Sequence, residues 1–103
     1  MATFKRKAAT ADTAGVIVHT TPAGTTALVI GLILANKSAA PETADVDIDG
    51  TYVVKNAPIP IGSTLAVLDG KMVVQENEII TVTASANNAI DATISILELW
   101  ADM

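Results

Sequence analysis

Residues 25–35, TTALVIGLILA, decide the fold class of this chain. The run follows a Thr-Pro-Ala-Gly turn signal and stops at Asn36. Its apolar side chains occupy both faces of a strand, and it is too short to cross a bilayer. It therefore predicts a β-strand buried from two sides, by the chain's own sandwich or partly by another subunit, with Gly31 at a close approach of backbone. If one subunit covers the whole strand, its core contains Leu28, Ile30, Leu32 and Leu34.

Short alternating or β-branched segments lie on both sides of this run. Residues 43–49 place apolar and acidic side chains on opposite faces, and 89–100 predict a long closing strand with Ile90, Ala92, Ile94 and Ile96 on one face. Pro58 and Pro60 predict an edge or crossover segment that links two sheets. The expected hairpins are 15–20 with 25–35, 43–49 with 51–55 through Asp49-Gly50, and 63–68 with 71–75 through Asp69-Gly70.

This spacing predicts an all-β fold, a single antiparallel β-sandwich of about eight strands, jelly-roll or immunoglobulin-like. We expect two parts. An extended basic N-terminal arm covers residues 1–14, and the β-sandwich domain covers residues 15–103. No segment carries the apolar stripe of an amphipathic helix.

Composition favours an assembly and argues against several classes of function. Half of the 103 residues are hydrophobic, yet only three are aromatic, so a small aliphatic core leaves apolar surface for other subunits. The formal charge is −5, which argues against a nucleic-acid ligand. We expect no signal peptide and no membrane partner, because the hydrophobic region of a signal and a transmembrane run are both missing. Cysteine is absent.

The best candidate for a metal site is the sequence Asp45-Val-Asp47-Ile-Asp49-Gly, which matches the opening of an EF-hand calcium loop. The twelfth position is Asn56, where such a loop needs a bidentate glutamate. On a strand these three carboxylates point the same way in a line. We therefore favour a solvated strand face ending in a tight turn, with Lys55 close to the acidic line.

No group of residues predicts catalysis or a cofactor. His19 is the only histidine, and it has no serine or cysteine partner that the sequence can argue for. We therefore expect a non-enzyme. The residues expected to bind partners are those of the basic arm and the last aromatic residue, namely Phe4, Lys5, Arg6, Lys7 and Trp100.

Three segments resemble a group of small virion structural proteins of tailed bacteriophages, especially those of cyanobacteria and other aquatic bacteria. They are the Pro-Ala-Gly turn before the aliphatic strand that ends at Asn36, the segment KNAPIPIGS at 55–63, and the closing strand that ends in Leu-Glu-Leu at 97–99. The resemblance spans about residues 15–99.

The resemblance implies a capsid decoration (cement) protein that sits between capsomers, with the major capsid protein as partner. It implies a homo-oligomer, with a trimer favoured, located on the capsid surface of the virion after synthesis in the host cytoplasm. The basic arm would then reach an acidic capsid surface or a neighbouring subunit. One alternative is a tail, neck or baseplate connector of the virion. Another is a calcium- or carbohydrate-dependent receptor-binding module that uses Asp45, Asp47 and Asp49.

Overall fold

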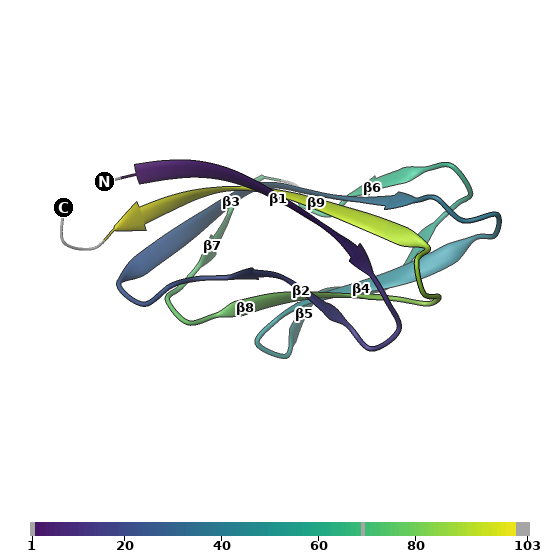
Figure 1. Cartoon of the computed structure of the whole chain (residues 1–103), viewed down its shortest axis with the longest axis horizontal. Coiled ribbons are helices and arrows are strands. Elements are labelled where there is room, and N and C mark those ends of the chain that lie inside the picture. The colour runs from purple at the N-terminus through teal and green to yellow at the C-terminus, as the bar shows by residue number, and fades with distance from the viewer. Residues whose placement is uncertain (1, 69, 101–103) are drawn as a thin grey trace.

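The chain folds into two antiparallel sheets packed face to face (Figure 1), in a computed structural model that describes residues 2–68 and 70–100. Sheet A has the order β1 (Ala2–Ala11), β9 (Ile90–Trp100), β3 (Thr25–Asn36) and β6 (Thr64–Ala66), and β7 (Met72–Val74) also pairs with β3. Sheet B has the order β2 (Val16–Thr20), β8 (Ile79–Ala84), β4 (Glu42–Ile48) and β5 (Thr51–Ile59). The predicted all-β sandwich is confirmed.

The core lies between the sheets and consists of small aliphatic side chains. β9 alternates strictly, so that Ile90, Ala92, Ile94 and Ile96 are buried while the residues between them are less so. Val46 of β4 and Val82 of β8 lie on the opposite wall of the same core. The predicted closing strand is therefore confirmed. The described residues contain no helix long and apolar enough to cross a membrane.

A β-bulge in β3 corrects the first expectation from the sequence. Val29 pairs with Ile96 and Gly31 with Ser95, so Ile30 has no partner and the alternation of faces changes there. Leu32 and Leu34 therefore point into the core, whereas Ile30 is 40% exposed. The prediction that one chain buries both faces of this strand was therefore wrong. Apart from its two chain neighbours, no described residue has an atom within 4 Å of the position that a Gly31 side chain would take, so the described part of the chain makes no close backbone approach there.

Two of the three predicted hairpins are also corrected. β2 and β3 belong to different sheets. Between them, the Thr21 amide donates a hydrogen bond to the Glu78 carbonyl in the β7–β8 turn at 3.0 Å, which holds the chain there. β6 and β7 do not pair with each other; both run antiparallel to β3, at residues 33–35 and 27–29. Asp69, in the turn expected between them, lies outside the described residues.

The third hairpin and the proline-rich crossover are confirmed. β4 pairs with β5 across Asp49-Gly50, and both turn residues have positive φ, as a tight primed turn requires. β5 contains Pro58 and forms an edge of sheet B. Edge strands tolerate a missing amide donor. The chain crosses to sheet A directly after β5.

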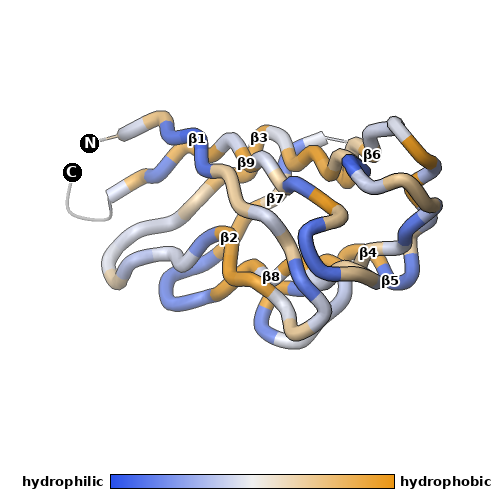
Figure 2. Tube along the Cα trace, turned by 45° about the vertical axis from the view of Figure 1, so that its right-hand side comes forward, coloured by the Kyte–Doolittle hydropathy of each residue, from blue (hydrophilic) through white to orange (hydrophobic). Residues whose placement is uncertain are grey.

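The basic N-terminal segment is an edge strand of the sandwich and not an arm outside it. β1 pairs with β9 without interruption from Ala2↔Leu99 to Ala11↔Ile90. In Figure 2 the basic stretch of β1 is the blue part of the tube beside the N-terminus. Its inward positions include lysines, whose aliphatic stems can line an apolar edge. Because lysines occupy inward positions where an aliphatic residue is usual, the sequence of this strand does not show the alternation of apolar and polar residues.

Gly15, just before β2, and Gly31, at the β3 bulge, differ in how closely neighbouring atoms surround the place of a side chain. A Cβ on Gly15, whose φ is +94°, would lie 3.1 Å from Thr81 and Thr83, whereas one on Gly31 meets nothing within 4 Å. We expect Gly15→Ala to lower the free energy of unfolding by about 1–3 kcal/mol, because backbone strain and crowding add. Gly31→Ala should change it by less than about 1 kcal/mol. Urea unfolding of both variants checks this, and equal losses would contradict it.

Candidate functional site

The outer face of sheet A carries an unbroken apolar row across four strands. Phe4 on β1 lies beside Leu97 on β9, which lies beside Leu28 on β3, which lies beside Val73 on β7. Phe4 is 75% and Val73 59% exposed, and the two leucines between them are partly exposed. Apolar side chains in one contiguous row on a solvent face indicate a contact surface.

Other residues extend this row along the strands. Ile30, pushed outward by the bulge, and Ile33 are both exposed, and Ile33 pairs with Ala66 on one side and Thr93 on the other. Arg6 pairs with Ser95 and lies on β1 between the row that contains Phe4 and Leu97 and the row that contains Thr93 and Ile33. We call this surface the apolar face, and define it by Phe4, Leu28, Ile30, Ile33, Val73 and Leu97.

The outer face of sheet B differs in character. There Asp45 pairs with Thr83 and Asp47 with Thr81, so acidic and hydroxyl side chains occupy the outward positions of β4 and β8. An antiparallel sheet normally presents one such polar face to water. Sheet B follows that rule except at Ile17 and Tyr52, which are exposed on its outer face. Sheet A departs from the rule over a contiguous row.

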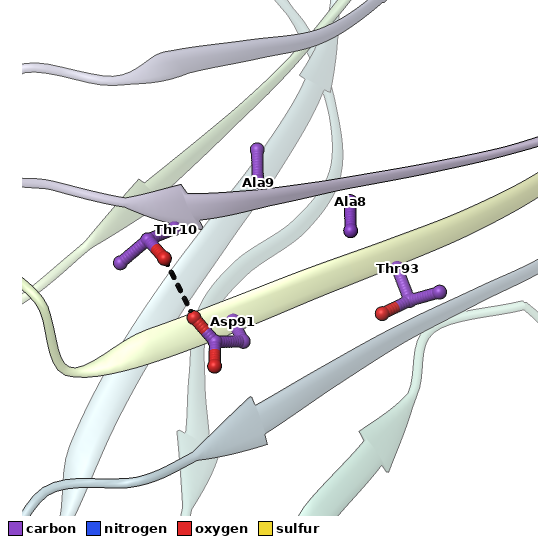
Figure 3. Close-up of a pocket in the computed structure, with 5 residues that line it drawn as sticks. All are labelled: Ala8, Ala9, Thr10, Asp91 and Thr93. Atoms are coloured by element: carbon purple, nitrogen blue, oxygen red, sulfur yellow. Dashed lines mark hydrogen bonds between the residues drawn. The ribbon is translucent and has the colours of Figure 1, made fainter.

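A shallow hollow of about 340 Å³ lies at the far end of sheet A from Phe4 (Figure 3). Ala8, Thr10 and Thr93 line it together with Ala9 and Asp91, and these short side chains leave the space open. Thr10 Oγ1 donates a hydrogen bond to Asp91 Oδ1 at 2.7 Å, and Lys37 Nζ lies 2.9 Å from the same oxygen. Lys37 first and then Thr10 lower the pKa of the Asp91 carboxyl.

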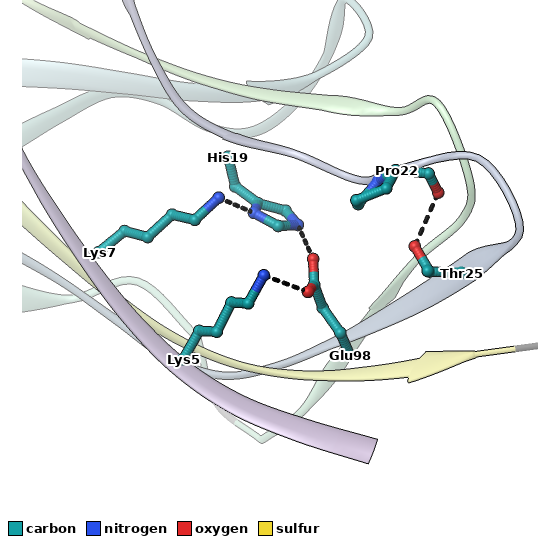
Figure 4. A network of polar contacts seen from close by, with 6 residues as sticks. All are labelled: Lys5, Lys7, His19, Pro22, Thr25 and Glu98. Atoms are coloured by element: carbon teal, nitrogen blue, oxygen red, sulfur yellow. Dashed lines mark hydrogen bonds and ion pairs between the residues drawn. The ribbon is translucent and has the colours of Figure 1, made fainter. Parts of the chain in front are cut away.

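A buried polar cluster joins the two sheets at the end where β1 begins (Figure 4). Glu98 on β9 is fully buried, and Lys5 Nζ on β1 lies 2.7 Å from its Oε1. His19 on β2 is 1% exposed, and its Nε2 lies 3.9 Å from Glu98 Oε2, which is too long for a hydrogen bond. Lys7 Nζ lies 3.0 Å from His19 Nδ1. Edge strand β1 is thereby tied to both sheets.

The protonation of His19 follows from these contacts. An ammonium group only donates hydrogen bonds, so Nδ1 accepts from Lys7 and the ring is neutral with its proton on Nε2. Desolvation, followed by the charge of Lys7, lowers the pKa of His19, although Glu98 acts in the opposite direction. The ring is sealed from solvent. The cluster therefore serves packing of β1 and offers no access to a substrate.

The structure separates the residues that the sequence grouped as partner-binding. Phe4 and Arg6 point outward on the apolar face, whereas Lys5 and Lys7 point inward to the buried cluster. Trp100 pairs with Thr25 at the end of β9 and is partly exposed. The sequence analysis missed Glu98. The available signal was that Glu98 continues the inward positions of Ile90, Ala92, Ile94 and Ile96.

The three aspartates of the EF-hand-like sequence bind three different backbone amides. Asp45 accepts from Asn56 N at 2.6 Å, Asp47 from Gly50 N at 2.9 Å and Asp49 from Ile79 N at 2.9 Å. Lys55 Nζ lies 3.3 Å from Asp45, the lysine contact that the sequence indicated. Among residues 2–68 and 70–100, no cluster of His, Cys, Asp or Glu side chains is placed to hold a metal ion.

No model of a protein family matches this chain, and no curated protein sequence matches it either. Chains from solved structures share its fold, among them the following two. One is a chain of the acid-stable capsid of the Helicobacter pylori bacteriophage KHP30, with a TM-score of 0.60, 8% identity, and coverage of 97% of this chain and 88% of that chain. The other belongs to the disulfide-linked pili of Bacillus endospore appendages, with a TM-score of 0.58, 14% identity, and coverage of 97% and 87%.

At these identities the likeness shows the fold alone. Neither match is specific to phages of cyanobacteria. This chain has no cysteine, so it cannot form the disulfide links for which the pili are described.

The Lys5–Glu98 pair should respond to substitution as a buried pair does. Lys5→Met leaves the Glu98 carboxylate without its cation and should lower the free energy of unfolding by about 1–3 kcal/mol, a range reduced because Lys5 is partly exposed. Lys5→Met combined with Glu98→Met should recover most of this loss. Lys37→Met is the matched control, since the exposed Lys37–Asp91 pair should contribute at most about 1 kcal/mol. Urea unfolding checks all three, and a double variant as unstable as Lys5→Met would contradict the assignment.

Stability should fall on acidification because of His19. Its pKa is lowered in the folded chain from the ordinary value of 6.5, so the unfolded chain binds more protons below about that pH. The free energy of unfolding is therefore expected to decrease from pH 7 to pH 5, and His19→Asn should flatten this slope. The lowered pKa of Asp91 acts in the same direction only near its ordinary value of 3.8 and below. Chemical denaturation at several pH values measures the slope; an unchanged slope in His19→Asn would refute the prediction.

Proposed function

We propose that this chain is a structural protein of a bacteriophage virion, and specifically a non-enzymatic capsid decoration subunit at the surface of the particle. The observation that carries the proposal is the apolar face of sheet A, a contiguous row of apolar side chains that the described residues leave uncovered, whereas the outer face of sheet B is mainly polar around Ile17 and Tyr52. A subunit that works alone gains nothing from such a face, whereas a subunit of a repeated assembly uses it as a contact.

The fold supports the same proposal. Solved structures that share it include a chain of a phage capsid and one of pili, both of which are assemblies of many protein subunits. The resemblance to small phage virion proteins selects the phage alternative. The major capsid protein and further copies of this chain would be its partners, and virion assembly would follow its synthesis in the host cytoplasm.

The mechanism of such a subunit is thermodynamic. A protein that binds only the assembled shell stabilises that shell by mass action, by about 2.7 kcal/mol per site when its free concentration is one hundred times the Kd. Contacts repeated by symmetry add to one another through avidity. The proposal needs a rigid sandwich with a contact face, and it needs no catalytic residue, cofactor or metal.

Abundance in the particle tests the proposal and separates it from a tail, neck or baseplate connector. In purified particles of the phage that encodes this chain, a decoration subunit should approach the copy number of the major capsid protein. A connector ring would contribute on the order of a dozen copies. Particles assembled without the chain should lose their contents at a lower temperature, and adding back purified chain should restore heat resistance. Absence of the chain from purified particles would refute a virion role.

A further inference from the structure

We infer that the occupant of the apolar face is a second copy of this chain, packed face to face in antiparallel orientation around a two-fold axis. This inference deepens the proposed function, because it names the partner of the same surface. In this arrangement the Phe4 end of one sheet A covers the hollow at the Ala8–Thr10 end of the other.

Shape complementarity is the first argument. The bulky apolar row containing Phe4, Leu97, Leu28 and Val73 lies at one end of sheet A, and the hollow lined by Ala8, Thr10 and Thr93 lies at the other end. Turning a second copy through a two-fold axis between these ends brings the large side chains of each copy over the small side chains of its partner. Interdigitation of large and small residues is how two sheet faces pack at about 10 Å.

Charge complementarity is the second argument. Arg6 is exposed midway along the edge strand β1 and has no ion-pair partner among the described residues, whereas Asp91, which also pairs with Lys37 at 2.9 Å, lies at the hollow end. An axis through Arg6 itself would set two arginines against each other. If the axis is displaced from Arg6 towards Ala8, Arg6 of one copy lies close to Asp91 of the other. The offset between the two residues, measured along the strand, is then within about 7 Å, which an arginine side chain can span. Two equivalent ion pairs then form.

The edge of the same sheet argues against another mode of association. β1 is an edge strand whose inward positions carry Lys5 and Lys7 and whose outward positions include Arg6. Charged and inward-pointing residues on an edge strand oppose the addition of a further strand. A second copy is therefore directed to the face of sheet A and away from its β1 edge.

The area sets the expected strength of the contact. Four strands about 4.8 Å apart, overlapping over roughly 25 Å, cover on the order of 500 Å² per copy. Both copies together reach about 1,000 Å², the lower limit of specific interfaces. We therefore expect a dimer that dissociates on dilution, and an isologous contact of this kind closes at two copies and not at the three that the phage resemblance implies.

A charge exchange between two variants tests the inference. Sedimentation velocity of the wild-type chain over a concentration series should show monomer and dimer. R6D and D91R should each be monomeric, because each places like charges opposite one another, and an equimolar mixture of the two should dimerise again, because one ion pair then forms in the original order and the other in the reversed order. Circular dichroism confirms that each variant is folded.

A second pair of variants keeps the test independent of Asp91, whose contacts with Lys37 and Thr10 are lost in D91R. Phe4→Ala removes an exposed aromatic contact and should raise the dimer Kd by about tenfold or more. Tyr52→Ala, at an exposed aromatic position on sheet B, is the matched control and should leave the Kd unchanged. A wild-type monomer at millimolar concentration, a wild-type trimer, a loss in Tyr52→Ala equal to that in Phe4→Ala, or folded charge variants whose mixture stays monomeric would each overturn the inference.

These outcomes are separable from those of the proposed function. A chain that is abundant in particles yet monomeric in solution at every concentration would refute the two-fold contact and leave the virion role standing. A chain that dimerises as described but is absent from purified particles would refute the virion role and leave the contact standing.

Discussion

The ion pair between Lys5 and Glu98 fixes how the edge strand sits on the sandwich. The Glu98 carboxylate is buried at the end of β9 and needs a cation, and β1 supplies one at 2.7 Å. A shift of β1 by one residue would exchange its two faces. Lys5 would then leave Glu98, and Phe4 and Arg6 would turn into the core. The interior pair therefore sets the register that places an aromatic and a cation on the outer face of sheet A.

The bulge at Ile30 has the complementary effect on β3. Without it, Leu28, Ile30, Leu32 and Leu34 would share the outer face, because Ala27 and Val29 point into the core. The extra residue changes the parity, so that Leu32 and Leu34 enter the core while Ile30 and Ile33 point outward. An aliphatic run with residues on both faces is thereby divided between an interior that the chain fills itself and an exterior beside Phe4, Leu97 and Val73. The high hydrophobic content of this segment is therefore explained by two uses, one in the core and one on the outer face of sheet A.

The sequence predicts those parts of the fold that depend on local alternation and turn chemistry. The β4–β5 hairpin, the closing strand and the proline-bearing edge strand all have such signals. The sequence does not predict the features that depend on contacts between distant residues. Lysine at an inward position does not look like a strand residue until Glu98 is placed opposite it. The turn before β3 has ordinary hairpin residues, but Thr21 is held by Glu78, more than fifty positions away in the sequence. The apolar face likewise requires the register of four strands, which no single segment contains.

The contrast between the outer faces of the two sheets limits the roles that such a fold can perform. A sandwich with two polar faces is complete as a monomer, and one with two apolar faces would aggregate without a preferred orientation. Here one face is mainly acidic and hydroxyl-rich, the other has an apolar row at one end and Thr10, Asp91 and Thr93 at the other, and the β1 edge carries charged side chains. These features favour the face of sheet A over the β1 edge as a contact surface. A subunit of this kind is suited to repeated, symmetric contacts, in which many individually weak interfaces are stable together.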